Sequence, residues 1–185
     1  MEIKGVAVKS IPEFVKSKFP ERYDEWLESL PLESRKLFHG PVFPSQWYPL
    51  EHAAVIPTEY VGKVFYNNNT REGAWQSGRH SADAALSGIY RFFVKASTPA
   101  FIIGRAGKIF STYYQPSKME VPNKDSKSVT LQITEFEKPS ALIEFRIGGW
   151  VERALEISGC SGVKVNITKS LTKGDPVTEY SIKWS

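Results

Sequence analysis

The residues best suited to chemistry are three histidines and a single cysteine, and their spacing does not combine them into a reactive site. His39, His52 and His80 are too far apart, from one another and from Cys160, for a zinc motif. A thiolate nucleophile needs a base to activate it, and no residue near Cys160 in the sequence supplies one. We therefore predict no catalytic residue and no metal site, and interpret the protein as a non-enzyme.

Two acid–base neighbours and one glycine pattern allow a second interpretation. Glu51 precedes His52, and Asp83 follows His80 by three residues, but surface ion pairing accounts for both pairs. The segment Gly104-Arg-Ala-Gly-Lys is similar to a phosphate-binding loop, although its glycines fall within a predicted helix and not between a strand and a helix. We interpret these glycines as small residues that allow two helices to approach closely.

Composition limits the protein to a modest set of classes. The chain has 185 residues, of which 41% are hydrophobic and 24% charged, a mixture typical of a soluble globular protein. The net charge of +4 is too small to imply a nucleic-acid partner. No apolar run approaches the roughly 18 residues of a membrane span, and the N-terminus lacks the apolar stretch of a signal peptide. One cysteine allows no internal disulfide, so we expect a cytoplasmic protein.

Residues 1–97 read as a helical part. Prolines suited to the first turn of a helix divide it into short segments, and Trp47 opens a further helix with Pro49 in its first turn. A longer apolar face then repeats with helical period. The predicted helices cover Ile11–Phe19, Glu21–Leu30, Leu32–Phe38 and Ala74–Lys95.

Residues 98–185 combine one central helix with alternating segments. The predicted helix Pro99–Tyr114 is apolar over a wide arc, and a short helix begins at Gly148. Alternation of apolar and polar residues predicts strands. In the strand predicted over Ala141–Ile147, Glu144 and Arg146 lie on the face opposite the apolar residues. The predicted strands cover Lys127–Phe136, Ala141–Ile147, Gly162–Thr168 and Glu179–Trp184. We therefore expect a single α+β domain in which N-terminal helices pack against a mainly antiparallel C-terminal sheet.

Several motifs resemble a known group of domains. The segments Thr98-Pro-Ala-Phe-Ile-Ile-Gly-Arg-Ala-Gly-Lys and Gly148-Gly-Trp-Val-Glu-Arg-Ala-Leu-Glu resemble those of 4-vinyl-reductase-like small-molecule-binding domains. These are similar in fold to the core subunits of the vesicle-tethering transport particle (TRAPP) and to haem nitric-oxide-binding (H-NOX-like) domains. With Leu32-Glu-Ser-Arg-Lys-Leu-Phe and Phe43-Pro-Ser-Gln-Trp-Tyr-Pro-Leu-Glu, the whole chain resembles an uncharacterised bacterial family known mainly from myxobacteria.

The same resemblance implies where a haem would be held, and the chain departs from that pattern. Haem nitric-oxide sensors bind iron through a histidine on a late core helix and hold the propionates with a Tyr-x-Ser-x-Arg motif. All three histidines of this chain precede the helix predicted over Pro99–Tyr114, and Tyr114-Gln-Pro-Ser-Lys-Met lacks both the spacing and the arginine. We therefore expect no cofactor, haem included.

The resemblance, together with 13% aromatic residues, implies a small-molecule-binding or sensor domain of bacterial signalling. Its ligand would be small and hydrophobic and would lie in an apolar pocket between the helices and the sheet, with Arg105 holding an acidic head group. Two alternatives stay open: a protein-interaction or scaffold module that forms a homodimer or binds a protein partner, and a reductase-like enzyme. The candidate wall residues are Trp47, Tyr48, Phe93, Phe101, Phe110, Tyr114 and Trp150.

Overall fold

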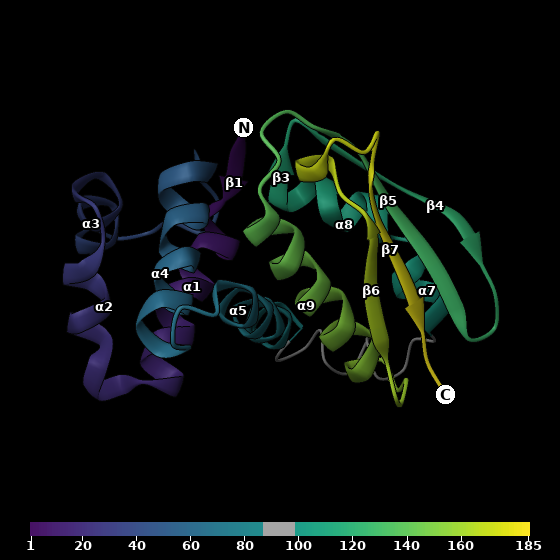
Figure 1. The fold of residues 1–185 in the computed structure, drawn as a ribbon, viewed down its shortest axis with the longest axis horizontal. Coiled ribbons are helices and arrows are strands. Elements are labelled where there is room, and N and C mark those ends of the chain that lie inside the picture. Colours follow the sequence, from purple (N-terminus) through teal and green to yellow (C-terminus); the bar gives the residue numbers. More distant parts are fainter. Residues whose placement is uncertain (87–98) are drawn as a thin grey trace.

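A computed structural model describes residues 1–86 and 99–185 of the chain (Figure 1). The N-terminal helices gather at one end, a four-stranded sheet forms the other end, and α5 and α9 (Ala141–Ile157) lie between them. The prediction of an α+β fold with a mainly antiparallel C-terminal sheet is confirmed. The helices of the N-terminal part are α1 (Gly5–Lys18), α2 (Tyr23–Ser29), α3 (Leu32–His39), α4 (Ile56–Phe65) and α5 (Thr70–Ala85).

The N-terminal helices follow the predicted order with shifted boundaries. Helix α1 begins at Gly5, six residues before the predicted start, and carries Pro12 inside it. The longer helix forms because its apolar positions recur three and four residues apart and bury one continuous face. Helix α5 begins after Asn69, whose side-chain oxygen accepts a hydrogen bond from the N–H of Glu72 at 3.1 Å. The predicted helix Ala74–Lys95 is confirmed as far as Ala85; Leu86 caps the end of α5, and residues 87–95 lie outside the described residues.

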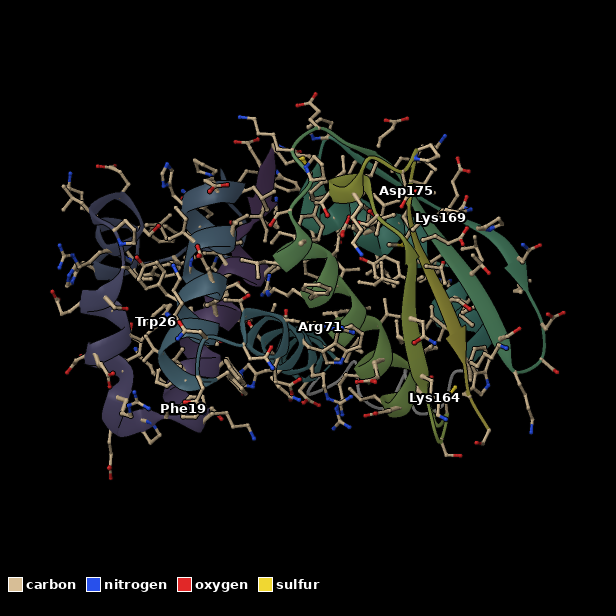
Figure 2. All side chains as sticks on the ribbon, in the orientation of Figure 1. Phe19, Trp26, Arg71, Lys164, Lys169 and Asp175 are labelled. Carbon is tan, nitrogen blue, oxygen red and sulfur yellow. The ribbon has the colours of Figure 1, made fainter. Side chains whose placement is uncertain are left out.

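Aromatic side chains fill the core of this helical end. Trp26 is fully buried, and its indole N–H donates to the carbonyl of Pro57 at 3.3 Å. The rings of Phe19 and Phe65 stack with centroids 4.1 Å apart. Trp26 and Phe19 both lie at the end of the molecule away from the four-stranded sheet (Figure 2). These aromatic residues therefore stabilise the helices and do not reach the sheet.

A small three-stranded sheet joins the first residues of the chain to two distant segments. Its central strand is β1 (Glu2–Lys4), flanked by β2 (Trp47–Pro49) and β3 (Tyr114–Gln115). Both neighbours are antiparallel, and Ile3 lies opposite Tyr48 on one side and Tyr114 on the other. The prediction of a helix beginning at Trp47 is wrong, because pairing with β1 holds these residues extended.

The main sheet has the strand order β4-β5-β7-β6, and every neighbouring pair is antiparallel. Alternation explains its two faces: Leu131 and Tyr180 are partners on the buried face, while Gln132 and Glu179 are partners on the outer face. The last two predicted strands, Gly162–Thr168 and Glu179–Trp184, are confirmed with limits shifted by one or two residues. The four strands are β4 (Ser117–Lys124), β5 (Ser128–Phe136), β6 (Lys164–Lys169) and β7 (Thr178–Lys183).

One predicted strand is a helix. Residues 141–147 form the first two turns of α9 (Ala141–Ile157), so the prediction of a strand over Ala141–Ile147 and of a helix beginning at Gly148 is wrong. The residues that α9 buries, among them Ile143, Ile147, Val151 and Leu155, recur every four residues and continue past the predicted boundary. Strand β5 already has β4 and β7 as partners, so no open edge remains beside it for this segment.

The predicted helix Pro99–Tyr114 is divided into two. Helix α7 (Pro99–Ile103) and helix α8 (Ala106–Tyr113) are separated at Gly104 and Arg105.

In the part of the chain that the structure describes, no helix has the length and apolar character needed to cross a membrane.

Helices α5 and α9 cross at very short range. A Cβ atom added to Gly78 would lie 2.0 Å from the carbonyl oxygen of Arg146, and one added to Gly149 would lie 2.1 Å from that of Trp75. Glycine is therefore required at both positions for the two backbones to meet. Ion pairs border the contact: Arg79 binds Glu156 at 2.8 Å and also contacts Glu152. This crossing fixes α9 between the helical end and the sheet.

Candidate ligand-binding site

An apolar cavity of about 70 Å³ lies between α7, α8, α9 and the buried face of the sheet. Residues from α1 and α5 complete its wall, so both parts of the chain contribute to it. The wall residues are Ala7, Ser81, Ile102, Ile103, Ala106, Ile109, Phe110, Tyr113, Tyr114, Met119, Val129, Leu131, Arg146, Ile147, Trp150, Val151, Ala154 and Leu155.

The sequence of α8 explains how it presents an apolar face to the cavity. Ala106, Phe110 and Tyr113 are spaced by four and three residues, so they share one face of the helix. Lys108 and Ser111 are exposed on the other side. The helix thus presents aliphatic and aromatic side chains to the cavity and polar ones to solvent.

Arg146 is the charged residue among the described residues of this wall, and its side chain is almost entirely buried, with 2% exposed. Its Nη2 donates to the carbonyl of Ala7 and to Oγ of Ser10, both at 2.8 Å. Its Nε has no hydrogen-bond partner among the described residues. The guanidinium therefore joins α9 to α1 while leaving donor capacity unused.

No carboxylate balances this charge. None of the ion pairs between described residues includes Arg146, and residues 87–98 contain no Asp or Glu. Burial lowers the pKa of Arg146, and the neighbouring phenols of Tyr114 and Tyr113 raise it. Burial in turn raises the pKa of both phenols, which are therefore neutral hydrogen-bond donors near pH 7. The cavity wall combines one unpaired cation with two phenols and an otherwise mainly apolar surface.

Three of the predicted wall residues lie on this wall: Phe110, Tyr114 and Trp150. The ring of Phe110 lies 5.1 Å from that of Tyr114, and Trp150 packs against Tyr113 at 6.2 Å. The structure therefore brings these residues from α8, β3 and α9 together around one space.

Four other predicted site residues, Trp47, Tyr48, Phe101 and Arg105, do not line the cavity. Phe101 is 45% exposed, and the guanidinium of Arg105 lies over its ring at 3.6 Å, outside the cavity. Trp47 and Tyr48 lie in β2, where Lys4 covers the Trp47 ring and the Tyr48 hydroxyl accepts a hydrogen bond from the backbone N–H of Phe43. Phe93 lies outside the described residues.

Arg146 was not among the residues predicted for the site. The alternation of apolar and polar residues predicts a strand there, with Arg146 opposite the apolar residues, where a charged side chain faces solvent. The signal that identifies it is the four-residue repeat of apolar positions through α9, which turns Arg146 toward α1 and the cavity.

The histidines and the cysteine lie away from the cavity wall. His80 is half-buried on α5 with its ring 5.5 Å from that of Phe14, and burial lowers its pKa. Burial raises the pKa of the Cys160 thiol, which disfavours the reactive thiolate. Across residues 1–86 and 99–185, no cluster of three or more His, Cys, Asp or Glu side chains could hold a metal ion.

Comparison with known proteins shows which solved structures share this fold. No protein-family model matches the sequence, and no curated protein matches it. Among solved structures, the H-NOX protein of Shewanella oneidensis in its Fe(II)NO ligation state matches with a TM-score of 0.72, 13% identity and coverage of 99% of both chains. The Fe(II) unliganded H-NOX protein of K. algicida matches with a TM-score of 0.69, 13% identity and coverage of 99% of this chain and 97% of that chain.

The chain has the H-NOX fold. The predicted likeness in fold to haem nitric-oxide-binding domains is confirmed, whereas the likenesses to vinyl-reductase-like domains, TRAPP subunits and a myxobacterial family stay predictions. At 13% identity the H-NOX likeness establishes architecture and does not transfer a ligand.

The described wall does not fit a haem. It carries neither histidine nor cysteine, and the cavity of about 70 Å³ is several times smaller than the roughly 300–1,000 Å³ typical of sites for cofactors and drug-sized ligands. Wall groups of types that hold iron in other haem proteins are the phenols of Tyr113 and Tyr114 and the thioether of Met119. Burial raises the pKa of both phenols, which disfavours the phenolate that would bind iron.

Proposed function

We propose that this protein is a non-enzymatic sensor domain that binds a small, mainly apolar molecule in the cavity between α8, α9 and the sheet. The observation that carries the proposal is the cavity itself, which lies inside an H-NOX fold and has a wall of mostly aliphatic and aromatic side chains. Such a wall suits a ligand that loses water on binding, because burial of apolar surface is the main source of affinity.

The chemistry of the wall supports binding in preference to catalysis. General acid–base catalysis at pH 7 usually relies on an imidazole or a carboxyl group within hydrogen-bond reach of the substrate. Neither group is present among the described wall residues. Two neutral phenols and a guanidinium can orient a ligand but are poorly suited to exchange protons with it at that pH.

We further propose that the resident ligand is not haem. The size of the cavity and the absence of an imidazole or thiolate from its described wall support this view. The H-NOX structures with the same fold include Fe(II) forms, so the test must measure haem directly.

Xenon provides a neutral probe of the cavity, since it enters apolar protein cavities too small for larger molecules. We expect saturable ¹²⁹Xe chemical-shift changes with the wild-type protein and their loss in Ala154→Leu, which fills the cavity from α9. Ala141→Leu adds the same group on the same helix outside the wall and should preserve xenon binding.

Two results would contradict the proposed function. Xenon shifts that are absent in the wild type, or unchanged in Ala154→Leu, would show that the cavity does not accept a ligand. Stoichiometric haem, seen as a Soret band that survives desalting and as added mass in native mass spectrometry, would contradict the haem-free proposal.

A further inference from the structure

We propose that Arg146 binds the carboxylate of a small organic acid whose hydrocarbon part occupies the cavity. This inference rests on the proposed function and specifies its ligand as a monoanion. The observation behind it is a guanidinium that is 2% exposed, lines an apolar cavity and has no carboxylate partner.

An unpaired buried charge is unusual enough to require an explanation. Removing a cation from water is unfavourable unless an anion or a full set of hydrogen bonds replaces the lost hydration. Nη2 of Arg146 donates to two oxygens of α1, whereas Nε has no acceptor among the described residues. A ligand that brings its own negative charge would complete the site.

Two partly exposed arginines of the same helix pair show that this arrangement is particular to the cavity. Arg79 on α5 binds Glu156 at 2.8 Å, and Arg153 on α9 binds Asp83 at 2.8 Å. Both are more exposed than Arg146, yet both have carboxylate partners. The residue that most needs a counter-charge is therefore the one that lacks it.

The chemistry of the wall specifies a carboxylate in preference to a neutral polar group. The planar guanidinium fork matches the two oxygens of a carboxylate, and charge-assisted hydrogen bonds are stronger than neutral ones. The neutral phenols of Tyr113 and Tyr114 lie beside Arg146 and can donate to the same oxygens. The wall thus offers donors from α8, β3 and α9 to one anionic head.

Size and charge limit the rest of the ligand. A water needs at least about 10–15 Å³ measured in this way, so a cavity of about 70 Å³ holds roughly five heavy atoms. One cation among the described wall residues favours a single negative charge. The remaining wall residues, such as Ile147 and Leu155, are suited to contact a short hydrocarbon chain. Propionate meets these limits, and propionamide is its uncharged analogue of nearly the same shape.

The test compares these two probes by NMR titration at pH 7, following the methyl groups of Ile147 and Leu155. We expect the wild-type protein to bind propionate at least tenfold more tightly than propionamide. Arg146→Met should lose this preference, and Arg146→Lys, which keeps the charge, should retain part of it. Arg153→Met removes an arginine of the same helix outside the cavity and should keep the full preference.

Equal binding of propionate and propionamide by the wild type, or an unchanged preference in Arg146→Met, would overturn the inference. If Arg146→Met does not fold, the wild-type comparison and Arg146→Lys decide the question. Xenon binding without any propionate binding would leave the proposed function standing and reject the anionic ligand. Binding of neither probe would reject both.

Discussion

Two buried charged residues of α9, Glu144 and Arg146, lie two positions apart and differ in how fully their side chains are hydrogen-bonded. Glu144 is 5% exposed and accepts hydrogen bonds from the hydroxyls of Ser170, at 2.6 Å, and of Thr178. The hydroxyl of Thr172 adds a third, longer bond at 3.3 Å. Arg146 is 2% exposed, and while its Nη2 has two acceptors, its Nε has no hydrogen-bond partner among the described residues.

The difference shows which buried charge belongs to the fold and which to the cavity. The donors around Glu144 come from the connection between β6 and β7 and from the start of β7, so this carboxylate ties the sheet to the helix that covers it. Arg146 turns toward α1 and the cavity, where the chain offers no anion. Glu144 therefore has a structural role, and Arg146 has capacity left for another molecule.

The largest expected effect comes from removing the structural charge. Glu144→Ala should lower the free energy of unfolding by about 3 kcal/mol, because it leaves buried hydroxyls without their acceptor. Urea unfolding followed by circular dichroism measures this change. Glu120→Ala on the exposed side of β4 is the control and should change stability by less than about 0.5 kcal/mol. A loss below about 1 kcal/mol for Glu144→Ala would remove the structural half of the comparison.

Removing the charge of Arg146 should not destabilise the protein, in contrast to removing that of Glu144. In the absence of ligand, Arg146→Met should leave the free energy of unfolding unchanged or raise it by about 1 kcal/mol. The reason is that Ser10 Oγ already donates to the carbonyl of Ala7 at 2.8 Å, so neither α1 oxygen depends on the guanidinium alone.

The matched variant Arg79→Met should instead lower the same free energy by about 1–2 kcal/mol, because it breaks partly buried contacts with Glu152 and Glu156. Thermal and urea unfolding of both variants provide the measurement. A loss larger for Arg146→Met than for Arg79→Met would mean that Arg146 also belongs to the fold.

The smallest expected effect is a change in the pKa of His80, a histidine near Arg146. Burial lowers the pKa of His80, Asp83 and Glu13 raise it, and Lys18 and Arg146 lower it further. The pKa of His80 is therefore lower in the folded than in the unfolded protein, so the unfolded chain binds the proton more readily. As the pH falls below about 6.5, protonation of this histidine increasingly favours the unfolded state and the free energy of unfolding decreases. Arg146→Met should raise the pKa of His80, measured by NMR titration of its ring proton. No upward change would show that the guanidinium charge does not reach this ring.

The parts of the fold that sequence patterns predicted are those with one unambiguous period. Helix α3 and strands β5 to β7 have clear alternation or helical spacing, and their predicted limits differ from the observed ones by a few residues. Strand β4 was missed because it is an edge strand rich in charged residues, with Met119 as its buried residue. Strand β1 was missed because it has three residues and forms only through partners elsewhere in the chain.

The aromatic residues of the cavity wall could be predicted from the sequence, and Arg146 could not. Large aromatic residues such as Phe110 and Trp150 are buried wherever the chain places them, so their sequence alone suggested a wall. Arg146 could not be found while its segment was read as a strand, because residues 143, 145 and 147 alternate over a window too short to separate the two periods. The longer repeat through Leu155 separates them.

The central strand of the small sheet has a consequence for how the protein is made. Strand β1 leaves the ribosome well before its neighbour β3, which lies 113 positions later, as the hydrogen bond from Gln115 to Glu2 shows. During synthesis the two ends of this long loop cannot meet until all the helices of the N-terminal part and α8 have emerged. The N-terminal helices must therefore assemble around a strand that still lacks one of its partners, which favours a fold completed late and as a whole.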